Sequence, residues 1–335
     1  MSKAQFPSVP KAPRNVAPEP SALLATLAYF STFRHALTLE ELVPFQQFLH
    51  QTSQQIQTVL ADLMAQGWVG EAHGYYYLAG DEHLPFLRLD REQRAESWSA
   101  WISGATARLQ ALPFVSGLAI SGSLSKGTQD ECGDIDFFMV TPERRLWWCH
   151  AIQGRWRKLL SADRQKHFCI NYRIAENALM IPRRDLFTAT EIVFLKPVWN
   201  HDLFQRFWAT NDWVRQFYPA WVPPESPLGP AASSSRARNR IERMLSGAFG
   251  DWGERVIHRM IMRRVESRTR WEMRRAWGME LTADVCKMNN ADQSERTRLS
   301  CDLRIRRLEA EHHLHLVRWA WTLEMASEPE PRLQA

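Results

Sequence analysis

The chain has few cysteines, and they do not follow a metal-binding or disulfide pattern. Among its 335 residues there are five, at positions 132, 149, 169, 286 and 301, and no two of them form a CxxC pair. Zinc sites and disulfide frameworks both depend on characteristic cysteine spacings, so the sequence supports neither. Reduced thiols are typical of intracellular proteins, and we therefore expect a cytoplasmic protein.

Long hydrophobic runs are also missing. The uncharged apolar stretches 20–33 and 111–125 are shorter than the roughly 20 residues that a membrane-spanning helix needs. The first 20 residues contain prolines and charges but no continuous apolar core, which argues against a secretory signal. With 45% hydrophobic and 24% charged residues, the composition is that of a globular protein. We expect no membrane span.

A chain of 335 residues is longer than most single hydrophobic cores, so two or three domains are expected. Changes in composition and periodicity suggest where the domains begin and end. We expect a disordered arm (1–19), a small helical and hairpin domain (20–88), a core domain (93–220), a Pro- and Ser-rich linker (221–235) and an Arg-rich helical domain (236–325).

The first of these domains has three expected helices followed by a hairpin. Residues 21–33 form the first helix, and Thr38–Glu41 and Thr52–Gln55 have the spacing of capping boxes that begin the second and third. Residues 68–80 then read as a hairpin that turns near His73–Gly74. This order resembles a winged-helix domain. Winged helices often bind DNA through a basic helix, but the third helix here has no Lys or Arg, so DNA binding is not expected and docking of a partner is favoured.

Two aspartates interrupt the apolar strand expected over residues 134–141. Side chains two residues apart on a strand project from the same face, so Asp134 and Asp136 point together while Ile135 points to the opposite face. Neighbouring carboxylates repel each other unless a cation neutralises them. Carboxylate oxygens suit Mg²⁺ or Mn²⁺, which also bind the phosphates of a substrate. The pair therefore indicates a metal site for phosphate chemistry.

The residues before these aspartates add a second motif. Ile120-Ser121-Gly122-Ser123 forms a Gly-Ser turn, and ten residues separate it from Asp134-Ile135-Asp136-Phe137. This combination resembles the nucleotidyltransferase superfamily of DNA polymerase β. In that family a turn with the pattern hG[GS] precedes a strand with the pattern Dh[DE]h, where h is a hydrophobic residue and brackets enclose alternatives. The resemblance covers roughly residues 93–180. It implies an α+β fold with a polymerase β-like core, preceded here by the winged-helix-like domain and followed by the helical one.

By this resemblance, the chain transfers a nucleoside monophosphate from a nucleoside triphosphate to an acceptor and releases pyrophosphate. The acceptor is not identified and can be a small molecule, a protein or an RNA. The implied metal ligands are Asp134 and Asp136. The implied nucleotide-binding residues are Gly122 and Ser123, followed by Ser125 and Lys126 in the SLSKG run. Lys126 is a candidate phosphate contact, although a solvated lysine would look the same in sequence.

The chain departs from the family at the third carboxylate, which polymerising members carry on a later strand. The strand expected over residues 167–174 has Asn171 at that position, with His167, Cys169 and Arg173 expected on the same face. An amide cannot act as a base near neutral pH. Alternative groups are His167 and three nearby carboxylates, of which the last is favoured: Glu176, Asp185 and Glu191.

Two functions from different classes follow. The first is an active Mg²⁺-dependent nucleotidyltransferase with Asp134, Asp136, Asn171 and Glu191 at its catalytic centre. The second is a catalytically weakened relative that binds nucleotides or partners.

In the C-terminal region, the arginines around residues 255–263 either contact a polyanion or form a solvated helix face. Lys287 either approaches the nucleotide or is simply exposed.

Overall fold

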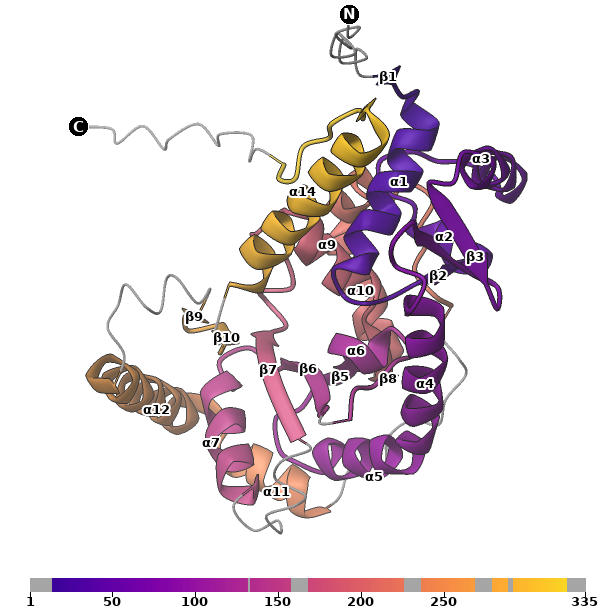
Figure 1. Ribbon diagram of the computed structural model, residues 1–335. Helices are drawn as coiled ribbons and strands as arrows, with labels where there is room; N and C mark the ends of the chain where they lie inside the picture. The colour runs from indigo at the N-terminus through magenta and orange to yellow at the C-terminus, as the bar shows by residue number, and fades with distance from the viewer. Residues whose placement is uncertain are drawn as a thin grey trace, which may run out of the picture. The chain divides into compact units, whose positions relative to one another are not determined.

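The computed structural model describes residues 14–131, 133–157, 168–225, 236–268, 279–288 and 292–323. Its elements combine helices with a mixed six-stranded sheet and two smaller sheets, so the expected α+β class is confirmed (Figure 1). Most of the expected arm, residues 226–235 of the expected linker, and His167 lie outside the described residues.

The chain divides into two compact units, each assembled from separate stretches of sequence. The first unit takes the residues up to 87 together with 216–220 and 296–321. The second takes 88–215, 221–295 and the residues from 322. The expected domains follow one another along the chain, whereas these units interleave. The expected C-terminal helical domain therefore contributes residues to both units.

The first unit contains the expected three helices and hairpin. Both capping boxes are present, with the Thr38 and Thr52 side chains accepting from the backbone N–H of Glu41 and Gln55. The hairpin turns at His73–Gly74, where both residues have positive φ. The elements are α1 (Pro18–Ser31), α2 (Leu39–Phe45), α3 (Ser53–Ala65), a three-stranded sheet in the order β2 (Leu37–Thr38), β4 (Tyr75–Leu78), β3 (Val69–Ala72), and the short parallel pair β1 (Arg14–Asn15) and β11 (Leu314–His315). Most of α14 (Gln293–His312) also belongs to this unit.

The second unit is built on the six-stranded sheet. Its strands lie in the order β8 (Lys196–Trp199), β5 (Gly117–Ile120), β6 (Ile135–Thr141), β7 (Phe168–Ala175), β10 (Val285–Lys287) and β9 (Glu280–Leu281). β6 and β7 are parallel, and the other neighbours are antiparallel. Strands β5 to β7 lie within the expected core domain (93–220), and the aspartate motif lies at the beginning of β6.

Helices cover both faces of this sheet. On one face, Ile135, Phe137 and Met139 of β6 pack into a core with residues of α5 (Ser99–Gln110) and α7 (Leu146–Arg157). On the other face, Phe138 contacts the rings of Phe204 and Phe207 from α10 (His201–Thr210). Alternate side chains of β6 therefore point into the hydrophobic core, and the others, including Asp136, point to the opposite face of the sheet. The remaining helices are α4 (Leu84–Ser97), α6 (Gly122–Ser125), α9 (Leu186–Val193), α11 (Arg236–Met244), α12 (Gly247–Arg268) and the 3₁₀ turn η1 (Asp212–Gln216).

The Arg-rich region is only partly helical. Residues 280–281 and 285–287 form β9 and β10, which extend the central sheet beyond β7, so the expectation of helices throughout 236–325 is wrong here. Val285 and Cys286 are buried by this pairing. Such short strands gain their stability from the edge of β7 and leave little local signal in the sequence.

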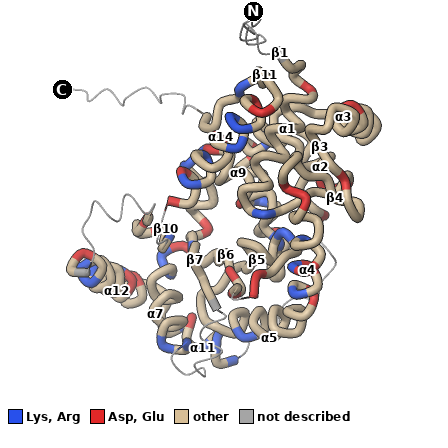
Figure 2. Tube along the Cα trace, in the orientation of Figure 1, with Lys and Arg blue, Asp and Glu red and all other residues tan. Residues whose placement is uncertain are grey.

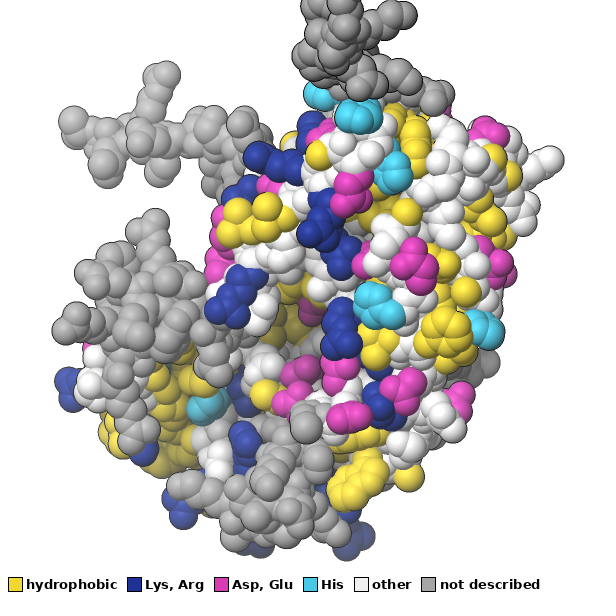
Figure 3. All heavy atoms as spheres, viewed as in Figure 1, with side chains coloured by type: hydrophobic (Ala, Val, Ile, Leu, Met, Phe, Trp, Pro, Cys, Tyr) yellow, Lys and Arg dark blue, Asp and Glu magenta, His cyan; other side chains and the backbone are white. Residues whose placement is uncertain are grey.

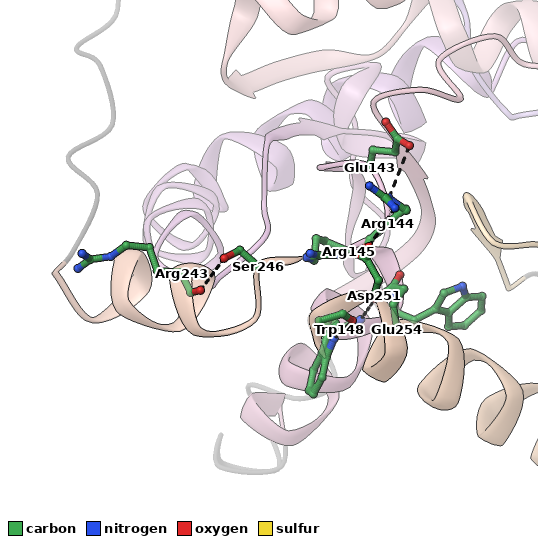
Figure 4. Close-up of polar contacts among 10 residues, drawn as sticks. Glu143, Arg144, Arg145, Trp148, Arg243, Ser246, Asp251 and Glu254 are labelled. Carbon is green, nitrogen blue, oxygen red and sulfur yellow. Dashed lines mark hydrogen bonds and ion pairs between the residues drawn. The ribbon is translucent and has the colours of Figure 1, made fainter. Parts of the chain in front are cut away.

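Helix α12 packs beside α7 through a polar contact at the beginning of α7 (Figure 4). The Glu254 carboxylate accepts the backbone N–H groups of Trp147 and Trp148 at 2.7 and 2.9 Å, and Asp251 forms ion pairs with Arg144 and Arg145. Backbone donors in the first turn of a helix lack partners within the helix, so Glu254 acts as a cap from another element. In the part of the chain that is described, no helix is both long and apolar enough to cross a bilayer.

Candidate functional site

The two motif aspartates and one cysteine form a cluster where β6 and β7 begin. Asp134 directly precedes β6, and Asp136 is its second residue. Cys169 lies opposite Asp136 on β7, and one ligand atom from each of the three side chains lies within 4.8 Å of the others. Figures 2 and 3 show acidic residues gathered in the region of β6. The expected convergence of Asp134 and Asp136 is therefore observed.

The surroundings of Asp136 disfavour the charged form of its carboxyl group. Burial, together with the charges of Asp134 and Glu191, raises the pKa of the Asp136 carboxyl to about 7, although Lys126 acts in the opposite direction. A carboxyl with this environment gains most from a cation bound beside it. The site therefore favours a positively charged ligand.

Gly122 makes room for this carboxylate. Its φ of +66° is one that residues with a side chain rarely adopt, and a Cβ built here would collide with the Asp136 side chain. The Asp136 carbonyl also accepts the N–H of Ser121, at 2.9 Å. The Gly-Ser turn and the aspartate strand are thus in direct contact, although ten residues separate the two motifs in sequence.

Gln129, which belongs to neither motif, joins the two. It is fully buried, its Oε1 accepts from the Ser123 hydroxyl at 3.1 Å, and its Nε2 donates to the Asp134 carbonyl at 3.0 Å. The Ser125 hydroxyl donates to the Gly122 carbonyl at 2.8 Å. The hydroxyls of Ser123 and Ser125, both expected to bind the nucleotide, therefore form hydrogen bonds within the protein. These bonds shape the turn. The only signal in the sequence was the position of Gln129 between the motifs.

Asn171 occupies the place expected for a third carboxylate. Its Nδ2 donates to Oδ1 of Asp136 at 2.8 Å, and its Oδ1 accepts from the Cys169 thiol at 2.8 Å. Burial and the nearby Asp136 and Asp134 raise the pKa of Cys169 to about 11, so the thiol form persists at neutral pH. Asn171 therefore orients Asp136 and is not itself a base.

Arg173, expected on the face of Asn171, lies on the opposite one. The register between β6 and β7 shifts between Asp136 and Phe138, which face Cys169 and Tyr172, so β7 has one extra residue there. This bulge reverses the alternation of side chains along the strand. Arg173 is buried and donates to Gln153 of α7, which belongs to the core face.

Among the three carboxylates considered as substitutes, the structure places Glu191 at the site. Its Oε1 accepts from Nζ of Lys126 at 2.9 Å, and Lys126 also donates to the Gly122 carbonyl at 3.3 Å. Lys126 is buried and paired, so this lysine is not a solvated one. Asp185 instead caps α9 by accepting the N–H of Thr188, and Glu176 pairs with Arg206.

A cavity of about 460 Å³ opens beside these residues. Its polar wall includes Gly122, Asp136, Asn171 and Glu191. The volume is in the range of small-molecule sites, which are mostly apolar with a few polar groups. The rest of its wall comes from β6, β7, α9, β10 and the segments near them, and among these residues the sequence had pointed only to Lys287, as one that could approach the nucleotide. These residues are Phe138, Tyr172, Ile181, Phe187, Thr188, Ile192, Leu195, Lys287, Met288 and Gln293.

The donor set fits Mg²⁺ or Mn²⁺. Asp134 and Asp136 offer carboxylate oxygens next to a cavity that leaves room for water and for a phosphate. A softer metal would be bound by Cys169 as the thiolate, whereas here the Cys169 thiol donates its proton to Oδ1 of Asn171. The two aspartates are therefore the residues that would hold such an ion.

Comparisons with known proteins do not add a family. The chain matches no protein-family model, no curated protein and no solved structure. We therefore infer the function of the site from its own residues.

Proposed function

We propose that the protein is a Mg²⁺- or Mn²⁺-dependent nucleotidyltransferase that transfers a nucleoside monophosphate from a nucleoside triphosphate to an acceptor. The observation that carries the proposal is the pairing of Asp134 with Asp136, which lies against Gly122 and lines the cavity. The bound ion would neutralise the two carboxylates and polarise the phosphate oxygens.

Glu191 is the residue we assign to the proton of the acceptor. Among the described residues that line the cavity, the carboxylates are Asp136 and Glu191, and the first is assigned to the metal. Lys126 keeps Glu191 in place through the 2.9 Å ion pair. A carboxylate held at the wall of the cavity can accept a proton from a hydroxyl as the hydroxyl attacks.

A second function is a nucleotide-binding protein with little or no transfer activity. The 2.8 Å hydrogen bond from Asn171 to Asp136 supports it, because an amide takes the place where the resemblance implies a carboxylate. This alternative uses the same metal and nucleotide site. It differs from the first only in turnover.

Transfer of label from each α-labelled nucleoside triphosphate, measured with Mg²⁺ and a cell extract as the source of acceptors, separates the two functions. The first requires label transfer that is lost in Asp134→Asn and Asp136→Asn and retained in Asp62→Asn, an exposed aspartate on α3. Tight nucleotide binding without transfer selects the second. Neither binding nor transfer would exclude both.

A further inference from the structure

The cavity has a cationic group that the proposed chemistry does not use. Lys287 is the last residue of β10 and pairs with Tyr172 of β7, and its Nζ lies 5.3 Å from the centre of the Tyr172 ring. Lys287 and Tyr172 both line the cavity. Within the described part of the chain, the ammonium has this ring contact but no hydrogen bond or ion pair. A cation over an aromatic ring is only partly compensated for its lost hydration.

The charges around Lys287 do not supply the missing partner. Burial lowers the pKa of Lys287, and Arg183 lowers it further, whereas Glu280, Asp185 and Asp292 act in the opposite direction. Asp185 and Asp292 already bind Arg183, at 2.5 and 3.1 Å. Asp185 also accepts from the Ser294 hydroxyl at 2.6 Å. Asp185 and Asp292 are therefore engaged with other groups. Glu280 lies opposite Lys287 in the β9–β10 pair, but within the described residues the two side chains form no ion pair, so the Lys287 ammonium remains available to a ligand.

An apolar wall separates Lys287 from the aspartates. β7 lies between β6 and β10, and Lys287 is level with Phe138, two residues along β6 from Asp136, so the backbones of Asp136 and Lys287 are more than the roughly 10 Å of two strand spacings apart. The rings of Phe138 and Tyr172 meet edge to face between them, with centroids 5.2 Å apart, and Phe187 lines the same cavity. A ligand that reaches both polar ends of the cavity must cross this aromatic wall.

We propose that Lys287 binds an anionic group, a carboxylate or a phosphate, of a ligand whose apolar or aromatic body lies against Phe138 and Tyr172. This inference rests on the proposed function only for what reacts at the opposite end of the cavity. The anion belongs either to the acceptor or to the nucleotide itself. Gln293, which also lines the cavity, offers an additional donor at its amide.

Small aromatic probes test the anion site without any nucleotide or metal. The affinities of phenyl phosphate, benzoate and neutral benzyl alcohol are measured by NMR titration of the full chain. We expect at least one anionic probe to bind about tenfold or more tightly than benzyl alcohol, since a hydrogen bond between charged groups is worth more than 1 kcal/mol. The preference should disappear in Lys287→Met and persist in Lys287→Arg.

Lys196→Met is the matched control, because Lys196 is an exposed lysine on β8 of the same sheet. It should leave the preference unchanged. Thermal unfolding of each variant shows whether it is folded. Equal affinity of the wild type for charged and neutral probes overturns the proposal, and so does a preference that survives in folded Lys287→Met.

Addition of saturating ATP with Mg²⁺ identifies the source of the anion. If the anion is part of the acceptor, ATP and the anionic probe bind together, and Lys287→Met binds ATP as well as the wild type does. If it belongs to the nucleotide, ATP displaces the probe and Lys287→Met weakens ATP binding. A preference for anions that depends on Lys287, in a protein that neither binds nor transfers nucleotides, would retain the anion site and reject the proposed function.

Discussion

The amide nitrogen of Asn171 lies 2.8 Å from Oδ1 of Asp136 and donates a hydrogen bond to it. The amide thus contacts the carboxylate that a third acidic side chain would repel. Replacing Asn171 with Asp tests what this contact does. Without metal, Asn171→Asp should lower the free energy of unfolding by about 2 kcal/mol or more, because a hydrogen bond to a charge is lost and a like charge is added.

Mg²⁺ should reverse much of that loss, by up to about 2.7 kcal/mol at a concentration a hundredfold above its dissociation constant. Urea unfolding with MgCl₂, against NaCl of equal ionic strength, measures the effect. Asn171→Leu is the control, since it removes the same hydrogen bond without adding a charge, and Mg²⁺ should not rescue it more than it stabilises the wild type. Equal rescue of both variants would show that position 171 does not contact the metal site.

Gly122 and Gly127 provide a matched pair for the role of the Gly-Ser turn. Both have positive φ, +66° and +70°, but a Cβ at Gly122 would meet the Asp136 carboxylate and one at Gly127 would meet nothing within 4 Å. Gly127→Ala should lose about 1 kcal/mol of unfolding free energy from backbone strain, and Gly122→Ala should lose more because its Cβ also collides with Asp136. Only Gly122→Ala should also lose affinity for Mn²⁺, measured by calorimetry. Unchanged affinity in Gly122→Ala would separate the turn from the metal site.

The ion pair of Lys126 with Glu191 should stabilise the fold as well as place the carboxylate. Only 7% of the Lys126 side chain is exposed, so Lys126→Met leaves the partly buried Glu191 without its partner. We expect a loss of about 2 kcal/mol in urea unfolding, less than for a fully buried pair because Glu191 is 34% exposed. The double variant Lys126→Met/Glu191→Gln should recover part of this loss. A double-mutant cycle with no coupling would contradict the pairing.

His150 should make stability depend on pH. Burial, followed by the charge of Arg173, lowers its pKa from 6.5 to about 3, so the folded protein keeps the ring neutral. The unfolded chain takes up a proton near pH 6.5, and stability is therefore lost as the pH falls from about 6.5 towards 3. Between pH 7.5 and 5.5 the wild type should lose about 1.4 kcal/mol from this group.

Urea unfolding at both pH values measures this loss. It should be absent from the pH dependence of His150→Gln and retained in His50→Gln, whose side chain is exposed. The same slope in His150→Gln as in the wild type would show that His150 can be protonated in the folded state.

Local patterns in the sequence predicted parts of the fold and of the site. Thr38 and Thr52 begin helices because each side chain caps the first turn of its own helix, and Asp134 and Asp136 converge because both lie at the beginning of one strand. These features depend on residues within a few positions of each other.

Features set by pairing between distant segments could not be predicted in this way. The bulge opposite Asp136 moves Arg173 to the core face, and the addition of β10 to the edge of β7 brings Lys287 to the cavity. Both depend on the register between strands that are far apart in sequence. Gln129 is a further case, since its contacts with Ser123 and Asp134 appear only when the turn and the strand are folded together.

Direct measurement of Mn²⁺ binding tests the central claim, that Asp134 and Asp136 hold a divalent cation beside a nucleotide. Electron paramagnetic resonance of Mn²⁺ is recorded with the full chain, with and without a nonhydrolysable ATP analogue, for the wild type, Asp136→Asn and the control Asp62→Asn. We predict that the wild type and Asp62→Asn bind Mn²⁺ more tightly when the analogue is present and that Asp136→Asn loses at least tenfold in affinity. Equal Mn²⁺ affinity in all three proteins would contradict the claim.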